Sequence, residues 1–98
     1  MRLVKIFRAA EWAAFHETGR YDGSADDRRD GFIHLSSAEQ VDGTLQRHFA
    51  GEVGLVIAEV DVAEDPDLRW ELSRGGAAFP YLYRPLLWAD VVGHEAHG

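Results

Sequence analysis

The spacing of apolar residues along the first third of the chain predicts strands, a helix and a loop. Leu3–Arg8 is rich in β-favouring residues and predicts a strand, and the alanine-rich segment Ala9–Thr18 predicts a short helix that Gly19 ends. Tyr21–Gly31 consists almost wholly of turn formers and charged residues, which predicts a solvated loop. Phe32–Leu35 then predicts a brief strand.

A second helix is predicted directly after that strand. Ser36–Glu39 has the spacing of a capping box, which favours a helix that begins there. Val41, Leu45 and Phe49 lie four residues apart and share one helical face. We expect this face to pack on a sheet, and Gly51 to end the helix in a left-handed turn.

The remainder of the chain predicts strands. Leu55–Asp61 is a nearly continuous apolar run, typical of a strand inside a sheet, and Leu68–Leu72 alternates apolar with charged residues. Phe79–Tyr83 is extended around its proline, and Leu86–Val92 predicts a last strand. This order of elements predicts a single compact α+β domain over residues 1–98, with two helices packed against a mostly antiparallel sheet.

Composition and charge exclude several classes of function and partner. The 98 residues suffice for one core, and the lack of cysteine excludes disulfides and Cys-based metal sites. The net charge of -7 is concentrated in residues 51–98, and Arg28 and Arg29 stand among aspartates, so nucleic acid is excluded as an expected partner. No stretch approaches the ~20 apolar residues of a membrane span, and no signal segment is visible, which predicts no membrane partner and a cytoplasmic protein.

His34 is a candidate site residue at the end of a predicted strand. Its side chain projects opposite to Ile33 and Leu35, which are expected to enter the core. The amides and hydroxyls of Ser36 and Ser37 follow directly, and such a position can hold an anion or a sugar hydroxyl. The alternative is a structural histidine that bonds a backbone carbonyl.

Three further polar residues are candidates, each with a plainer alternative. Gln40 and Arg47 are two helical turns apart, which is compatible with their facing one region, and an arginine offers a planar fork to a carboxylate or phosphate. A surface arginine without a specific role is the alternative. Glu71 can place a carboxylate at a cleft edge, as a base or to stabilise positive charge, or can simply pair with Arg69 or Arg74.

An aromatic stretch near the end of the chain is also a candidate. Phe79, Tyr81 and Tyr83 alternate along an extended segment and form either a wall that stacks on a flat ring or part of the core. The segment Gly93–Gly98 contains two histidines, but their spacing is not that of a metalloprotease helix. The sequence therefore predicts no metal site.

Several of these blocks together resemble the domain-of-unknown-function 952 family. The resemblance spans nearly the whole chain and is carried by Val4–Trp12, Gly31–Gln40, Arg47–Phe49, Trp70–Glu71 and Phe79–Tyr83. Some members bear a glutathione S-transferase label, but this chain lacks the two-domain size of that enzyme. The family is more distantly similar to the ADP-ribosyltransferase-like fold, a compact split sheet with helices that holds NAD in a cleft. The resemblance thus implies that fold here, with NAD as a candidate cofactor.

The resemblance also assigns roles. His34 matches the strand-end residue that holds the ribose of NAD, and Glu71 is a candidate for the carboxylate that steadies a ribosyl cation. The family usually has histidine where this chain has Tyr81, which removes a group that titrates near neutral pH. Tyrosine retains hydrogen bonding and gains stacking area, so binding is affected less than proton transfer.

Three hypotheses follow. The first is a polar cleft around His34 that binds a small anionic or nucleotide-like ligand. The second is an ADP-ribosyltransferase-like transferase or glycohydrolase acting on an NAD-type N-glycosidic bond, with His34 and Glu71 as catalytic residues. The third is a non-catalytic protein-interaction domain. The candidate ligand-binding residues are Ser36, Ser37, Gln40, Arg47, Phe79, Tyr81 and Tyr83.

Overall fold

A computed structural model describes residues 2–73 and 75–98 of the chain. Arg74, a candidate partner of Glu71, lies outside the described residues. The elements in chain order are β1 (Leu3–Phe7), α1 (Ala9–Thr18), β2 (Arg20–Tyr21), α2 (Ala25–Asp30), β3 (Ile33–His34), β4 (Ser36–Ser37), α3 (Val41–His48), β5 (Leu55–Val60), β6 (Leu68–Leu72), β7 (Ala78–Leu82), β8 (Leu86–Leu87), the 3₁₀-helix η1 (Trp88–Asp90) and β9 (Val91–His97).

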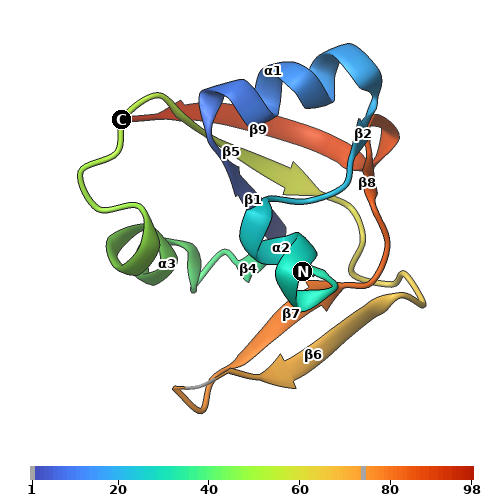
Figure 1. Cartoon of the computed structure of the whole chain (residues 1–98). Coiled ribbons are helices and arrows are strands. Elements are labelled where there is room, and N and C mark those ends of the chain that lie inside the picture. The colour runs from blue at the N-terminus through green and yellow to red at the C-terminus, as the bar shows by residue number, and fades with distance from the viewer. Residues whose placement is uncertain (1, 74) are drawn as a thin grey trace.

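The strands form a mostly antiparallel α+β fold, as the sequence predicts. A four-stranded sheet has the order β4-β1-β5-β9, a three-stranded sheet has the order β3-β7-β6, and β2 pairs with β8. Every one of these pairings is antiparallel. The β6–β7 hairpin extends away from the four-stranded sheet (Figure 1). No helix among the described residues is long and apolar enough to cross a membrane.

The main core forms where α1 packs on the four-stranded sheet. The helix follows β1 directly, and its Phe15 stacks on Phe7 with the ring centroids 5.5 Å apart. Trp12 and Tyr21 meet the same Phe7 ring edge-on, at 5.2 and 4.9 Å. Such geometries stabilise aromatic pairs beyond the area they bury. This aromatic cluster holds β1 in place. It thereby also positions the side chains of β1 that do not belong to the cluster.

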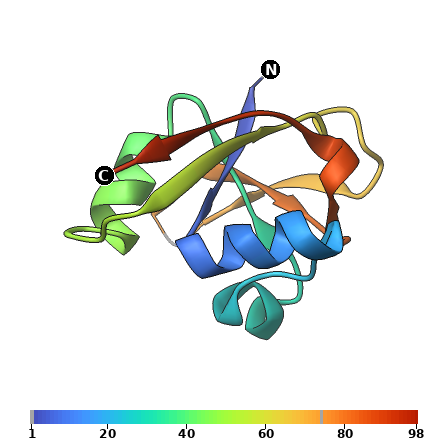
Figure 2. The ribbon, with the colours of Figure 1, turned by 90° about the horizontal axis from the view of Figure 1, so that it is seen from above.

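A second apolar cluster holds α3. Leu45 packs with Ile6 of β1 and Leu55 of β5, and Val41 and Phe49 pack around them. The helical face that the sequence predicts therefore does pack on the sheet. Seen from above, α3 lies near the C-terminus and away from α1 and α2 (Figure 2). Neighbouring residues of β1 thus contact different helices: Ile6 packs against α3, and Lys5 pairs with Asp27 of α2.

The expectation of two helices is wrong, because the segment predicted as a loop contains α2. Ser24 caps this helix: its hydroxyl accepts a hydrogen bond from the Asp27 amide at 3.2 Å, and its own amide donates to the Asp27 carboxylate at 2.9 Å. Gly31 ends α2 in the left-handed region, with φ of 86°. Local capping thus makes a third helix out of residues whose composition indicates a loop.

The predicted start of the second helix is also wrong. Ser36–Ser37 form β4, which pairs with β1, and α3 begins only at Val41 with Gln40 as its N-cap residue. Both serines are buried, so sheet pairing takes precedence over the capping box. The last predicted strand is divided as well, because η1 interrupts it and β9 continues to His97 along β5.

Candidate functional site

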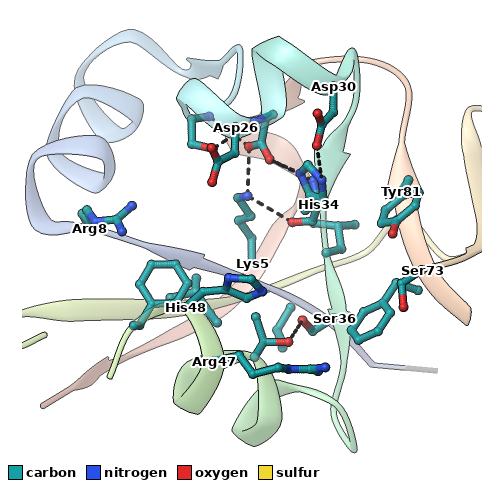
Figure 3. A pocket seen from close by; sticks show the side chains of 18 of the residues that line it. Lys5, Arg8, Asp26, Asp30, His34, Ser36, Arg47, His48, Ser73 and Tyr81 are labelled. Carbon is teal, nitrogen blue, oxygen red and sulfur yellow. Dashed lines mark hydrogen bonds and ion pairs between the residues drawn. The ribbon is translucent and has the colours of Figure 1, made fainter. Parts of the chain in front are cut away.

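A cavity of about 500 Å³ lies between α2 and α3 (Figure 3). Residues of β1 and β4 line it from the four-stranded sheet, and residues of β3 and β7 line it from the three-stranded sheet. This volume is within the range of pockets that bind small molecules. The cavity is therefore the place where the two sheets and two of the helices meet, and its walls differ in charge.

Asp27 is the most enclosed charged residue of the cavity, with 2% of its surface exposed. Its carboxylate accepts hydrogen bonds from Lys5 Nζ at 2.9 Å and from the Ser24 amide at 2.9 Å. It also accepts from the amide of His34 at 3.1 Å and contacts the His34 ring nitrogen Nδ1 at 2.6 Å. Burial raises the pKa of Asp27, but the bond from His34, the charge of Lys5 and the Ser24 amide outweigh it and hold the pKa below its usual range.

Lys5 supplies the buried positive charge. It is 7% exposed, in a strand whose five residues are all buried. Besides Asp27, its ammonium donates to the backbone carbonyl of His34 at 3.0 Å. Through these two bonds Lys5 connects β1 with α2 and β3, and Figure 3 shows its side chain between α2 and the wall that carries Arg47.

The His34 ring lies between two carboxylates. Nδ1 faces Asp27, and Nε2 is 3.0 Å from Oδ2 of Asp30 at the end of α2. A neutral imidazole donates from one nitrogen only, so bonding both carboxylates at once requires the imidazolium form. Arg29 donates to Asp30 at 3.1 Å and, together with the charge of His34, lowers the pKa of Asp30. The ring is held by side chains and not by the backbone carbonyl of the plainer alternative.

The opposite wall of the cavity is basic. Arg47 and His48 line it from the last turn of α3. Arg47 donates to the Gly43 carbonyl at 3.3 Å and lies over the Phe79 ring at 5.9 Å, and no carboxylate among the described residues forms an ion pair with it. Arg8, also at the cavity, is paired with Glu52. The guanidinium of Arg47 is therefore available to an anionic group inside the cavity.

The aromatic wall comes from β7. Tyr81 stacks on Phe32 with ring centroids 4.2 Å apart and meets the His34 ring edge-on at 5.4 Å. Burial and the nearby carboxylates of Glu71 and Asp30 raise the pKa of Tyr81, so its hydroxyl stays protonated at neutral pH. Tyr81 thus offers the cavity a flat face and a hydroxyl.

The structure brings together only some of the residues that the sequence indicates. The cavity is lined by the candidates His34, Ser36, Arg47, Phe79 and Tyr81. The candidates Ser37, Gln40, Glu71 and Tyr83 are not among its lining residues.

The other candidates have structural contacts. Gln40 accepts from the Ser37 amide at 3.1 Å and donates to the Ala78 carbonyl at 2.7 Å, which joins the start of α3 to β7. Glu71 accepts a hydrogen bond from the Tyr83 hydroxyl on the β6–β7 hairpin. The carboxylate that the resemblance assigns to catalysis therefore lies outside this cavity.

Sequence reasoning missed Lys5, Asp27, Asp30 and His48, which also line the cavity. Two signals were present. Lys5 is the only charge in an apolar strand, and Ser24 precedes Asp27 by the three residues of a capping box. No local pattern indicates that Lys5 and Asp27 meet, because they come from different elements 22 residues apart.

Comparisons of the sequence and of the α+β fold with known proteins define the class of this chain. A family model described as "Protein of unknown function (DUF952)" matches residues 6–94, and the chain belongs to this family. The crystal structure of protein CC0527 from Caulobacter crescentus is similar, with a TM-score of 0.92 and 48% identity over 98% of this chain and 85% of that chain. The solution NMR structure of CC0527 gives a TM-score of 0.87 and 47% identity over 97% and 83% of the two chains. No curated protein matches the chain.

Proposed function

We propose that the cavity between α2 and α3 binds a small anionic, nucleotide-like ligand. The observation that carries this proposal is that two unlike walls enclose about 500 Å³: the Lys5–Asp27–His34 network on one side and, on the other, the guanidinium of Arg47, which has no ion-pair partner in the described part of the chain. Buried ion pairs contribute little to stability compared with apolar packing. A contribution to stability therefore does not explain why such a network lies beside an open cavity, whereas ligand binding does.

The two walls suggest how the ligand is oriented. Its anionic group bonds Arg47 and His48, since arginine forms bidentate hydrogen bonds with phosphate and carboxylate. Hydroxyls or a partly positive group of the ligand face His34 of β3 and Asp30 at the end of α2. A flat ring lies against Tyr81, whose own ring is fixed by Phe32.

The finer form of the proposal is an ADP-ribosyltransferase-like site. A cavity lined from two separate sheets supports this likeness, and NAD, which combines phosphates, ribose and flat rings, is then the first ligand to test. One contact also favours an enzyme that cleaves an N-glycosidic bond: Asp30 lies against His34 within the cavity. In that mechanism the bond to nicotinamide breaks and nicotinamide leaves. Asp30, in place of Glu71, steadies the ribosyl cation while His34 holds the ribose, and water adds to the anomeric carbon and loses a proton to give ADP-ribose.

The binding proposal is tested by thermal shift with NAD, ADP-ribose, nicotinamide and a panel of small phosphates and carboxylates. A ligand at about ten times its Kd stabilises by about 1.4 kcal/mol, which raises the Tm of a chain of this size by roughly 5 to 10 °C. The shift is expected to be lost in Arg47→Gln and kept in Arg20→Gln, which removes the same charge from an exposed pair with Asp22. No shift with any member of the panel, or an equal shift in both variants, contradicts the proposal.

The enzymatic form needs a separate measurement. NAD is incubated with the protein, and nicotinamide and ADP-ribose are separated by chromatography. Turnover that disappears in Asp30→Asn, a change at a partly exposed side chain, supports the enzyme. A ligand that stabilises the protein and is recovered unchanged supports binding without chemistry.

A further inference from the structure

The three-stranded sheet has an unpaired apolar edge. Its order is β3-β7-β6, so among residues 2–73 and 75–98 β6 pairs with a strand on one side only, and Figure 1 shows it at the outside of the molecule. Trp70 is 43% exposed and Leu72 is 76% exposed on this strand. Such an edge is a template for another strand unless proline, a bulge or uncompensated charges block it. β6 has no proline and its register with β7 is continuous, so its two charges, Arg69 and Glu71, decide which strand can pair there.

The hydrogen bonds of β6 show which backbone groups face outward. The Tyr83 amide donates to the Asp67 carbonyl at 2.9 Å, and the Ser73 amide donates to the Ala77 carbonyl at 2.8 Å. Trp70 is opposite Pro80, which has no N–H to donate. Because inward and outward groups alternate along an antiparallel strand, residues 67, 69, 71 and 73 bond towards β7. Residues 68, 70 and 72 therefore direct their amides and carbonyls towards the free edge.

The sequence of β6 is complementary to itself in antiparallel register. It reads Leu-Arg-Trp-Glu-Leu over Leu68–Leu72. When two copies are aligned about Trp70, each Arg69 is opposite Glu71 of the other copy, and each Leu68 is opposite Leu72. Opposite charges and apolar residues placed directly across an antiparallel pair stabilise it. In this arrangement both charged residues of each strand lie opposite a residue of the opposite charge, and no two like charges face each other.

We propose that two copies of this chain associate through β6, antiparallel and centred on Trp70, so that their three-stranded sheets become one continuous sheet. The backbone of Trp70 exchanges two hydrogen bonds with Trp70 of the other copy. The Leu72 amide of each copy donates to the Leu68 carbonyl of the other, whereas the Leu68 amide already donates to Asp65 within its own chain. The side chains of Trp70 and Leu72 are then partly covered by those of the other copy, and the proposal does not depend on a ligand in the cavity.

The charge pattern gives the test. Sedimentation equilibrium is run over a concentration series that reaches about 1 mM, because an interface of one strand pair belongs to the small, weakly associating class. The wild-type mass is expected to rise from 11.0 kDa towards twice that value. Arg69→Glu places like charges opposite each other at two symmetric positions and should weaken association by roughly tenfold.

A second variant and a control separate this cause from misfolding. The double exchange Arg69→Glu with Glu71→Arg restores the opposite pairs and should recover association. Val92→Lys adds a charge at an exposed apolar residue, 59% exposed on the edge strand β9, and should leave association unchanged. A mass of 11.0 kDa at every concentration, or association by Arg69→Glu equal to that of wild type, overturns the proposal.

Discussion

Asp27 is the residue on which the arrangement of the site depends. It caps α2 through Ser24, pairs with Lys5 of β1 and orients the His34 ring of β3. Three elements thus meet at one carboxylate that is almost fully buried. Removing a buried charge leaves its partner uncompensated, which costs far more than the pair itself contributes.

Asp27→Asn should therefore destabilise the protein strongly. The change leaves the Lys5 ammonium buried beside a neutral amide, and we expect a loss of about 3 to 5 kcal/mol in the free energy of unfolding. Urea denaturation followed by tryptophan fluorescence measures it. Asp22→Asn, in an exposed pair with Arg20, should cost less than about 1 kcal/mol. Similar losses in the two variants would mean that the buried pair has no special weight.

The lowered pKa of Asp27 also predicts how stability depends on pH. The ionised carboxylate stabilises the fold fully above the unfolded-chain pKa of about 3.9, and this contribution is lost as the pH falls from there through the lower pKa of the folded state. The free energy of unfolding should decrease below about pH 4, and it should decrease less in Asp27→Asn than in the wild type. Urea titrations at a series of pH values decide this, and parallel pH profiles would argue against it.

Among the elements, β1, β5, β6, β7 and the apolar face of α3 could be predicted from the sequence, whereas α2, β4 and most of β9 could not. Leu45 and its neighbours form a pattern that is local and regular, so it can be recognised without knowing the fold. Ser36 follows a capping pattern equally well, but pairing with Val4 decides its structure. The same limit applies to the site: His34 is visible as a strand-end residue, while its contacts with Asp27 and Asp30 depend on where α2 folds.

Two glycines in helical contexts give an opposed pair of expectations. Gly43 lies inside α3, and an added Cβ would meet only Arg47 Nη2 at an ordinary 3.6 Å. Gly43→Ala should raise the free energy of unfolding by about 0.5 to 1 kcal/mol through helix propensity. Gly31→Ala should lower it by about 1 kcal/mol, because φ of 86° at the end of α2 is unfavourable for alanine. Chemical denaturation measures both, and changes of the same sign in the two variants would contradict this account.

For the molecule as a whole, Arg84 joins the parts of the chain that cross between the sheets. Its guanidinium donates to Asp65, in the connection from β5 to β6, at 2.9 and 3.1 Å. It also donates to Asp90, just before β9, at 2.8 and 3.1 Å. Hydrogen bonds from Asp90 and Asp65 raise the pKa of Arg84 despite its partial burial. The cavity is lined from both sheets, so the cluster of Arg84, Asp65 and Asp90 helps to keep the cavity walls in place although it does not line the cavity.

Arg84→Gln should therefore weaken the whole fold. We expect a loss of about 1 to 3 kcal/mol, since charged hydrogen bonds to two carboxylates disappear together. Arg2→Gln removes an exposed pair with Glu59 and should change stability by no more than about 0.5 kcal/mol. Thermal and urea unfolding of the two variants provide the comparison. Equal stability of both variants would show that the cluster does not hold the sheets together.

Lys5 also matters before the chain has folded. β1 is an inner strand, but Val4 pairs with Ser36 and Glu59, which the ribosome adds much later. Until then Leu3–Phe7 is an apolar, β-favouring segment without a partner, the kind of segment through which nascent chains aggregate. A charge within such a segment suppresses this association. By this principle the ammonium that Asp27 neutralises in the folded protein should earlier limit aggregation of β1 during synthesis.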